Sequence, residues 1–166
     1  MWTLCRNKIT LEELKTAKGD INIKNDSGDT PFNYICFYSG SNGFNMKILR
    51  YCCEVMKADI NIKNNDGSTP FHYICENSNS NGFNMKMLRY CCEVMKADMN
   101  VKNIYRTTPF YYLCKLNNHK ILKYLGKNNL LTNETIKNSE LTIKTKLRYF
   151  TEGILVNLCD PEYLLY

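Results

Sequence analysis

Two consecutive stretches of this chain are almost identical. Residues 20–58 begin with DINIKN and end with CCEVMKA, and residues 59–97 begin and end in the same way. A third copy opens at Asp98 and keeps the spacing of 39 residues between copies. Self-similarity at such a period is typical of stacked-repeat proteins, in which each unit packs only on its neighbours. A chain built in this way presents an extended surface, and the repeat therefore favours binding over catalysis.

The composition is that of an ordinary globular domain. The chain has 166 residues, of which 44% are hydrophobic and 23% charged, so we expect one domain with a single continuous core. No apolar run approaches the ~20 residues that a membrane-spanning helix needs, and the N-terminal stretch turns polar before a signal peptide could form. The sequence therefore predicts no membrane contact and no secretion. Apart from a lysine-rich stretch from Lys115 to Lys146, the charged residues behind the net charge of +6 are scattered through the repeats, and lysines on solvated helix faces account for them, so we expect no nucleic-acid partner.

The nine cysteines are interpreted as reduced thiols that fill the core. Cys36, Cys75 and Cys114 occupy equivalent positions in successive copies, where packed helices lie roughly 8–10 Å apart and beyond the reach of a disulfide. The adjacent cysteine pairs later in the first two copies diverge by about 100° on a helix and do not converge on one metal ion. We therefore expect neither metal nor cofactor, and the chain carries no nucleotide-binding or catalytic motif.

Within the second copy, the sequence predicts an extended arm, a tight turn and two helices. The tripeptide Asn65-Asp66-Gly67 is typical of a turn, because glycine adopts a positive φ without strain. Thr69 is suited to cap a helix over about residues 70–76, which opens with a proline. A second helix is expected over about residues 85–94, where apolar side chains recur at helical spacing and form one stripe.

This order of elements, together with the sequence motifs below, resembles the ankyrin repeat. The helix start G-x-T-P-F-x appears at residues 28–33 and 67–72, a weaker form appears at 107–111, and the closing A-D-x-N appears at 58–61 and 97–100. The resemblance implies an all-α, ankyrin-type helical repeat solenoid with short β-turn fingers and helical end caps. It also implies a protein-protein interaction module and no enzymatic activity.

Two departures from the usual repeat point to a narrower resemblance. The loops between the two helices of a unit are long, and a tyrosine follows each T-P helix start, at Tyr34, Tyr73 and Tyr112. Together with a composition rich in Asn, Ile, Lys and Tyr, these features resemble those of the divergent ankyrin proteins of poxviruses. That implies a monomeric viral protein that binds a host protein in the host cytoplasm, in a host-range or immune-modulating role. The alternative left open is a truncated remnant of a longer viral ankyrin and F-box-like protein.

The edges of the array differ from its middle. We expect an N-terminal half-repeat cap at residues 1–19, with Thr10 opening a capping box, because a solenoid must cover the apolar ends of its stack. The repeat motifs do not occur in residues 129–166, which are expected to form a helical cap or a degenerate fourth repeat. The complete repeats are expected at residues 20–58, 59–97 and 98–128.

Candidate partner-binding residues lie on the fingers and the first helices. In the third finger, Ile104, Tyr105 and Arg106 replace the turn tripeptide of the second copy, and aromatic and arginine side chains often anchor protein interfaces. The same residues could instead pack beneath the C-terminal cap, and this alternative stays open. The other candidates are Asp26, Asp66, His72 and Tyr111. His72 also fits a structural role, through a hydrogen bond to the threonine of its own helix start.

Overall fold

The computed structural model describes residues 9–40, 44–78, 85–115, 119–128 and 130. Within these ranges the regular structure is helical, and no β-strand occurs. This confirms the expected all-helical repeat stack. The elements are α1 (Leu11–Thr16), α2 (Pro31–Phe37), a 3-10 turn (Tyr38–Gly40), α3 (Met46–Arg50), α4 (Pro70–Glu76), α5 (Met85–Arg89), α6 (Pro109–Lys115) and α7 (His119–Lys127).

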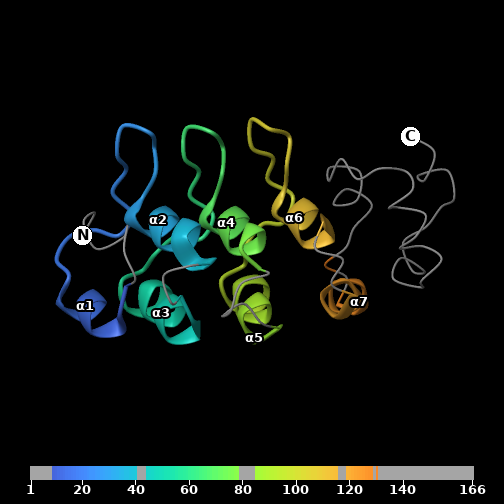
Figure 1. Ribbon diagram of the computed structural model, residues 1–166, viewed down its shortest axis with the longest axis horizontal. Coiled ribbons are helices and arrows are strands. Elements are labelled where there is room, and N and C mark those ends of the chain that lie inside the picture. Colours follow the sequence, from blue (N-terminus) through green and yellow to red (C-terminus); the bar gives the residue numbers. More distant parts are fainter. Residues whose placement is uncertain (1–8, 41–43, 79–84, 116–118, 129, 131–166) are drawn as a thin grey trace, which may run out of the picture.

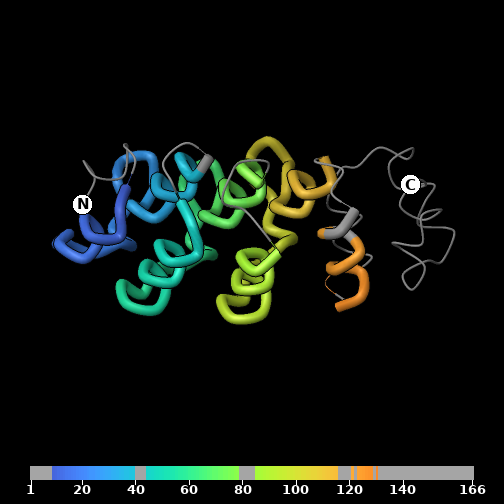
Figure 2. Tube along the Cα trace, turned by 60° about the horizontal axis from the view of Figure 1, so that its bottom comes forward, coloured from blue at the N-terminus to red at the C-terminus, as the bar shows by residue number. Residues whose placement is uncertain are grey.

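The helices form two rows along one elongated stack (Figure 1). One row contains the first helices of the three units, α2, α4 and α6, and the other contains α1 and the second helices α3, α5 and α7 (Figure 1). Helix α2 packs against α4, and α4 packs against α6, so equivalent helices of successive units are neighbours. Figure 2 shows the same succession of units from another direction. Three fingers project beside the row of first helices and lie next to one another (Figure 1).

The first helices begin at Thr-Pro pairs, where side chains satisfy the free backbone donors. In α2 the Thr30 hydroxyl accepts from the Asn33 N–H at 3.1 Å, and the Asn33 side chain accepts in return from the Thr30 N–H at 3.0 Å. In α4 the Thr69 N–H donates to His72 Nδ1 at 3.0 Å. Thr10 opens a third capping box at the start of α1, as the sequence predicted. These caps explain why such short helices begin at these residues.

The second helices differ from the regular α-helices that were expected. Helix α3 continues as a π-helical turn over Tyr51–Val55, and α5 continues in the same way over Tyr90–Val94. The first of these ends with the Ala58 N–H bonded to the Cys52 carbonyl at 2.9 Å, while Lys57 adopts a positive φ of 59°. The combined lengths match the prediction, but the wider turn was not foreseen.

The core runs along the stack between the two rows of helices. Phe32, Phe71 and Phe110, one from each first helix, are fully buried at equivalent positions. The seven cysteines that the structure describes are buried free thiols, which confirms their predicted place in the core. Burial raises the pKa of the Cys53 thiol to about 12, so this group stays protonated near neutral pH. No helix in the described ranges is long and apolar enough to cross a membrane.

Some predictions fall on parts of the chain outside the described residues. The N-terminal half-repeat is described from Ile9 onward. The predicted C-terminal cap or degenerate repeat, residues 129–166, lies outside the described residues apart from Leu130.

Candidate binding face

Each finger is organised by an asparagine at the start of its turn. Asn64 Oδ1 accepts from the Ser68 N–H at 2.8 Å, and Asn64 Nδ2 donates to the Tyr73 hydroxyl at 3.1 Å and to Asp29 Oδ1 of the preceding unit at 2.8 Å. Asn103 in the third finger donates in a similar way to the Ser68 hydroxyl at 3.1 Å. These side chains therefore close their own turn and also tie each finger to the one before it. Sequence reasoning identified the turn but missed this asparagine.

Neighbouring fingers are also joined along their backbones. The Asn65 N–H donates to the Ser27 carbonyl at 3.0 Å, and the Ile104 N–H donates to the Asp66 carbonyl at 2.8 Å. Gly28 lies at the first junction with a φ of 71°, and a Cβ there would come within 2.8 Å of the Asn65 backbone nitrogen. The positive φ and this close approach together explain why a glycine is required at the turn.

The third finger departs from this requirement at Arg106. Arg106 occupies the position of Gly28 and Gly67 and keeps a positive φ, at 60°. Such a conformation costs a residue with a Cβ roughly 1 kcal/mol relative to glycine. In the described part of the chain this is the last finger.

The side chains at the tip of the third finger are exposed. Ile104 is 61% exposed and Tyr105 is 69% exposed, and Arg106 is exposed beside them. Their backbone is held by Asn103, which accepts from the Arg106 N–H through its carbonyl and from the Tyr105 N–H through Oδ1. The tip therefore presents aliphatic, aromatic and cationic groups on an ordered turn. The cap that would cover it in the alternative prediction was expected at residues 129–166, which lie outside the described residues apart from Leu130.

Three other candidate residues are accessible on the same side of the stack. Asp26 and Asp66 are exposed in the first and second fingers. Tyr111 in α6 is partly buried and packs edge-on against Tyr112, with ring centroids 5.8 Å apart. The fingers and first helices thus carry the exposed Asp26 and Asp66, the partly exposed Tyr111 and the exposed tip of the third finger.

His72 does not lie on this face, which corrects its place among the candidate binding residues. It is only 1% exposed, because it points into the stack from the start of α4. Its Nδ1 accepts from the Thr69 N–H, as the structural role required, and its Nε2 lies 3.3 Å from the Thr107 carbonyl of the next unit. Burial lowers the pKa of His72 to about 4, so the ring is neutral near pH 7. His72 therefore links two units from a buried position.

The first two units differ at eight of their 39 positions, and these differences are unevenly distributed. Seven of the eight fall between residues 26 and 40 of the first unit, in the finger, the first helix and the turn after it. Exposed side chains of the second helices are identical in the two units, so exposure alone does not explain the divergence. Examples are Lys47 with Lys86, Glu54 with Glu93, and Val55 with Val94. The divergent pairs are Asp26 and Asn65, Ser27 and Asp66, Asp29 and Ser68, Asn33 and His72, Phe37 and Glu76, Tyr38 and Asn77, Gly40 and Asn79, and Ile48 and Met87.

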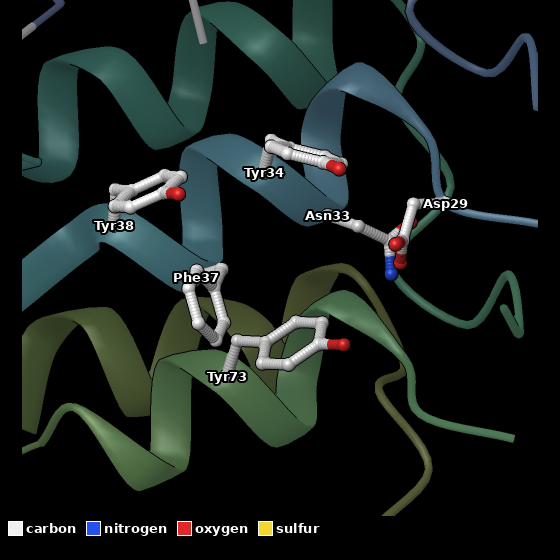
Figure 3. A pocket seen from close by; sticks show the side chains of 6 residues that line it. All are labelled: Asp29, Asn33, Tyr34, Phe37, Tyr38 and Tyr73. Atoms are coloured by element: carbon white, nitrogen blue, oxygen red, sulfur yellow. The ribbon is translucent and has the colours of Figure 1, made fainter. Parts of the chain in front are cut away.

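A pocket of about 180 Å³ opens between α2 and α4. Figure 3 shows the side chains that line it, which are Asp29, Asn33, Tyr34, Phe37, Tyr38 and Tyr73. Four of the six occupy divergent positions, and the other two are tyrosines at equivalent positions of the first and second units. Sequence reasoning missed the pocket. The available signal was the comparison of two nearly identical units, which differ where the pocket forms.

The chain matches a known protein family. A protein-family model described as Ankyrin repeats, with three copies, matches residues 41–138, which is more than half of the chain. The matched range includes the helices from α3 to α7. A search of curated proteins returned no match.

Proposed function

The chain belongs to the ankyrin repeat family, and from this premise we propose that it binds a protein partner on its fingers and first helices. Ankyrin repeats are typically non-catalytic scaffolds that present an extended surface. The observation that carries the proposal is the divergence of the first two units on this face. An irregular partner surface requires different side chains from one unit to the next, whereas the second helices keep the same exposed residues.

We assign the principal anchor to the tip of the third finger. Aromatic and arginine side chains account for much of the binding energy at protein interfaces, and Tyr105 and Arg106 stand exposed beside Ile104. Asp26 and Asp66 on the neighbouring fingers add negative charge, which favours a partner with complementary basic groups. Tyr111 extends the same face onto α6.

The finer proposal concerns the identity of the partner. We infer that it is a host protein and that the chain acts as a viral host-range or immune-modulating factor in the host cytoplasm. The support is the sequence resemblance to poxvirus ankyrin proteins, in the long loops between helices and the tyrosine after each Thr-Pro start.

The test is affinity capture from host-cell lysate with the tagged chain as bait, followed by mass spectrometry and titration of the captured protein. The third-finger variant carries Tyr105→Ala and Arg106→Gly, where the glycine relieves the positive φ. Val55→Ser serves as a matched control, because Val55 is an exposed apolar residue on the other row of helices. We expect the third-finger variant to lose about 2 kcal/mol or more of binding free energy.

Three outcomes decide between the readings of this face. A partner retained by Val55→Ser but lost by the third-finger variant supports the proposal. Unchanged binding together with a lowered melting temperature would mean that Tyr105 packs within the protein, since loss of a buried ring leaves a cavity. Failure of the wild-type chain to capture any protein would favour the truncated remnant.

A further inference from the structure

The pocket between α2 and α4 has aromatic walls. The Phe37 ring lies edge-on to Tyr38 and to Tyr73, with centroids 5.0 Å and 5.3 Å apart, and Tyr34 lies 6.3 Å from Tyr38. Figure 3 shows the four rings around a common space, with Asp29 and Asn33 together at one end. Phe37 is 50% exposed, although it is a large apolar side chain. The rings therefore border an open cup, not a filled part of the core.

The polar end of the pocket is negatively charged. Asp29 Oδ1 accepts one hydrogen bond, from Asn64 Nδ2 at 2.8 Å, and Asp29 forms no ion pair within the described residues. Partial burial raises the pKa of Asp29, and the nearby Asp66 carboxylate raises it further. The carboxylate thus lies in a partly desolvated site where a cation would offset its charge.

We propose that this pocket receives a cationic side chain, a lysine or arginine of the protein partner. The inference rests on the proposed function, because the cation belongs to the bound protein. Aromatic faces attract cations through the ring quadrupole, and a carboxylate at the end of the pocket supplies the opposite charge. An anionic group would be repelled by Asp29 and Asp66, and a neutral apolar group would leave the Asp29 carboxylate desolvated without compensation.

The next junction along the stack, between α4 and α6, has different side chains at the equivalent positions. Ser68 stands in the place of Asp29, Glu76 in the place of Phe37, and Asn77 in the place of Tyr38. The carboxylate at the finger base and two of the four rings are therefore specific to the first junction. Because the two units are otherwise nearly identical, this difference sets the register in which a basic partner segment binds the face.

The test uses the full chain and short peptides with blocked ends. The probes are Gly-Lys-Gly, Gly-Arg-Gly and Gly-trimethyl-Lys-Gly, with Gly-norleucine-Gly as the neutral control. Binding is followed by the chemical shifts of the tyrosine and phenylalanine rings. We expect the three cationic peptides to shift the rings of Phe37 and Tyr73 and to bind at least about fivefold more tightly than the norleucine peptide.

Two variants and one control make the result specific. Asp29→Asn keeps an oxygen for Asn64, and Phe37→Ala removes an exposed ring, so both should fold and lose at least about fivefold in affinity. Asp20→Asn is the control, because it removes one exposed carboxylate outside the pocket and retains the oxygen that accepts from the Asn22 N–H. Since the folded pKa of Asp29 is raised, its ionised form is disfavoured by folding, and Asp29→Asn should not lower the melting temperature at pH 7.

The outcomes separate this inference from the proposed function. Selective binding of the cationic peptides, lost in both pocket variants and kept in Asp20→Asn, supports it. Equal binding of the norleucine peptide, or no ring shifts with any cationic peptide, overturns it and leaves the capture experiment to judge protein binding. Cationic binding in a chain that captures no protein supports the pocket and rejects the proposed function.

Discussion

At the scale of single residues, the side chain at one equivalent position has its hydrogen-bonding groups satisfied in the second unit and not in the first. His72 accepts from the Thr69 N–H through Nδ1, so Nε2 carries the proton and faces the Thr107 carbonyl. Asn33 holds the same place in α2 and caps Thr30, but its buried Nδ2 has no hydrogen-bond partner among the described residues. The amide is shorter than the imidazole and does not reach the next unit. A buried donor without a partner costs stability.

Exchanging the side chains at these two positions tests whether His72 links two units and whether Asn33 leaves a buried donor without a partner. We expect Asn33→His to raise the free energy of unfolding by ~1 kcal/mol, because the new Nε2 would reach the Ser68 carbonyl of the next unit. His72→Asn should lower it by ~1–2 kcal/mol, because the link to Thr107 is lost. Urea denaturation at pH 7.5 measures both changes. A gain of stability in His72→Asn would contradict the assignment.

The pH dependence provides an independent check on His72. Its pKa falls from 6.5 to about 4 on burial, so the unfolded chain binds more protons between these values. The stability that this neutral imidazole contributes is complete above pH 6.5 and is lost as the pH falls toward 4. The unfolding free energy of His72→Asn relative to the wild type should therefore rise by on the order of 2 kcal/mol between pH 7.5 and pH 4.5, which offsets the destabilisation seen at pH 7.5. A difference that stays constant with pH would mean that the ring is not buried and neutral.

At the scale of elements, the second helices end in an unusual way that follows from their cysteine pairs. Cys52 and Cys53 are both buried, although neighbouring residues on an α-helix diverge by about 100°. The wider π-helical turn reduces this angle and lets both side chains face the core. The chain then reverses at Lys57, which takes the left-handed conformation usually left to glycine at a helix C-terminus.

The second helices of successive units are also clamped to one another. The Tyr90 hydroxyl donates to Glu54 at 2.9 Å, and the Arg50 guanidinium lies 5.4 Å from the centroid of the Tyr90 ring. Tyr124 in α7 repeats both contacts with a glutamate and an arginine of the second unit. The clamp recurs although the loop before α7 is shorter than the equivalent loops, because the tyrosine keeps its position within the helix.

The helix ends predict a stabilising substitution. Lys57→Gly should raise the free energy of unfolding by ~0.5–1 kcal/mol, because glycine adopts the positive φ of 59° without a Cβ penalty. The hydrogen bond from Asn22 Nδ2 to the Lys57 backbone carbonyl does not depend on the Lys57 side chain and should remain. Lys57→Ala is the control and should give no such gain, since alanine retains the Cβ. Equal effects of the two substitutions, measured by thermal denaturation, would assign the gain to loss of the lysine charge instead.

At the scale of the whole molecule, the stack is held by contacts between neighbouring units. Asn22 Nδ2 donates to the Lys57 carbonyl, and Asn22 Oδ1 accepts from the Asp59 N–H, both at 2.9 Å. Asn61 makes the equivalent two contacts, with the Lys96 carbonyl of its own unit and with the Asp98 N–H of the third unit. The recurring A-D-x-N motif therefore forms hydrogen bonds across unit boundaries. Stability in such an array is a sum of units and of interfaces between them, so a change in one interface affects the whole chain.

The thiols of this core predict the behaviour of the intact molecule. Burial raises the pKa of Cys75 well above its ordinary value and that of Cys92 to about 12, which keeps both thiols protonated. We expect the seven buried thiols to react with a thiol reagent only after unfolding. Titration in denaturant without reductant should then count nine free thiols, the number of cysteines in the chain. A count near one, or rapid reaction of the folded protein with the buried thiols, would contradict the packed core.

Much of the local structure follows from residues that act on their near neighbours in the chain. Thr10, Thr30 and the Thr69–His72 pair satisfy backbone donors within one turn by their side chains, and the starts of α1 and α4 were predicted at the residues where they occur. The repeat period placed equivalent helices side by side, and the apolar stripes placed the cysteines in the core. These signals are local or periodic, and a single sequence contains them in full.

Other features arise where residues from different units meet. The burial of His72 depends on the third unit covering it, and the pocket joins Asp29 at the base of one finger to Tyr73 on the helix of the next unit. The π-helical turns likewise depend on how two adjacent cysteines pack against neighbouring helices. Helix propensity and residue spacing describe one segment at a time. The burial, desolvation and charge at these sites depend instead on the distance between segments after the units have stacked.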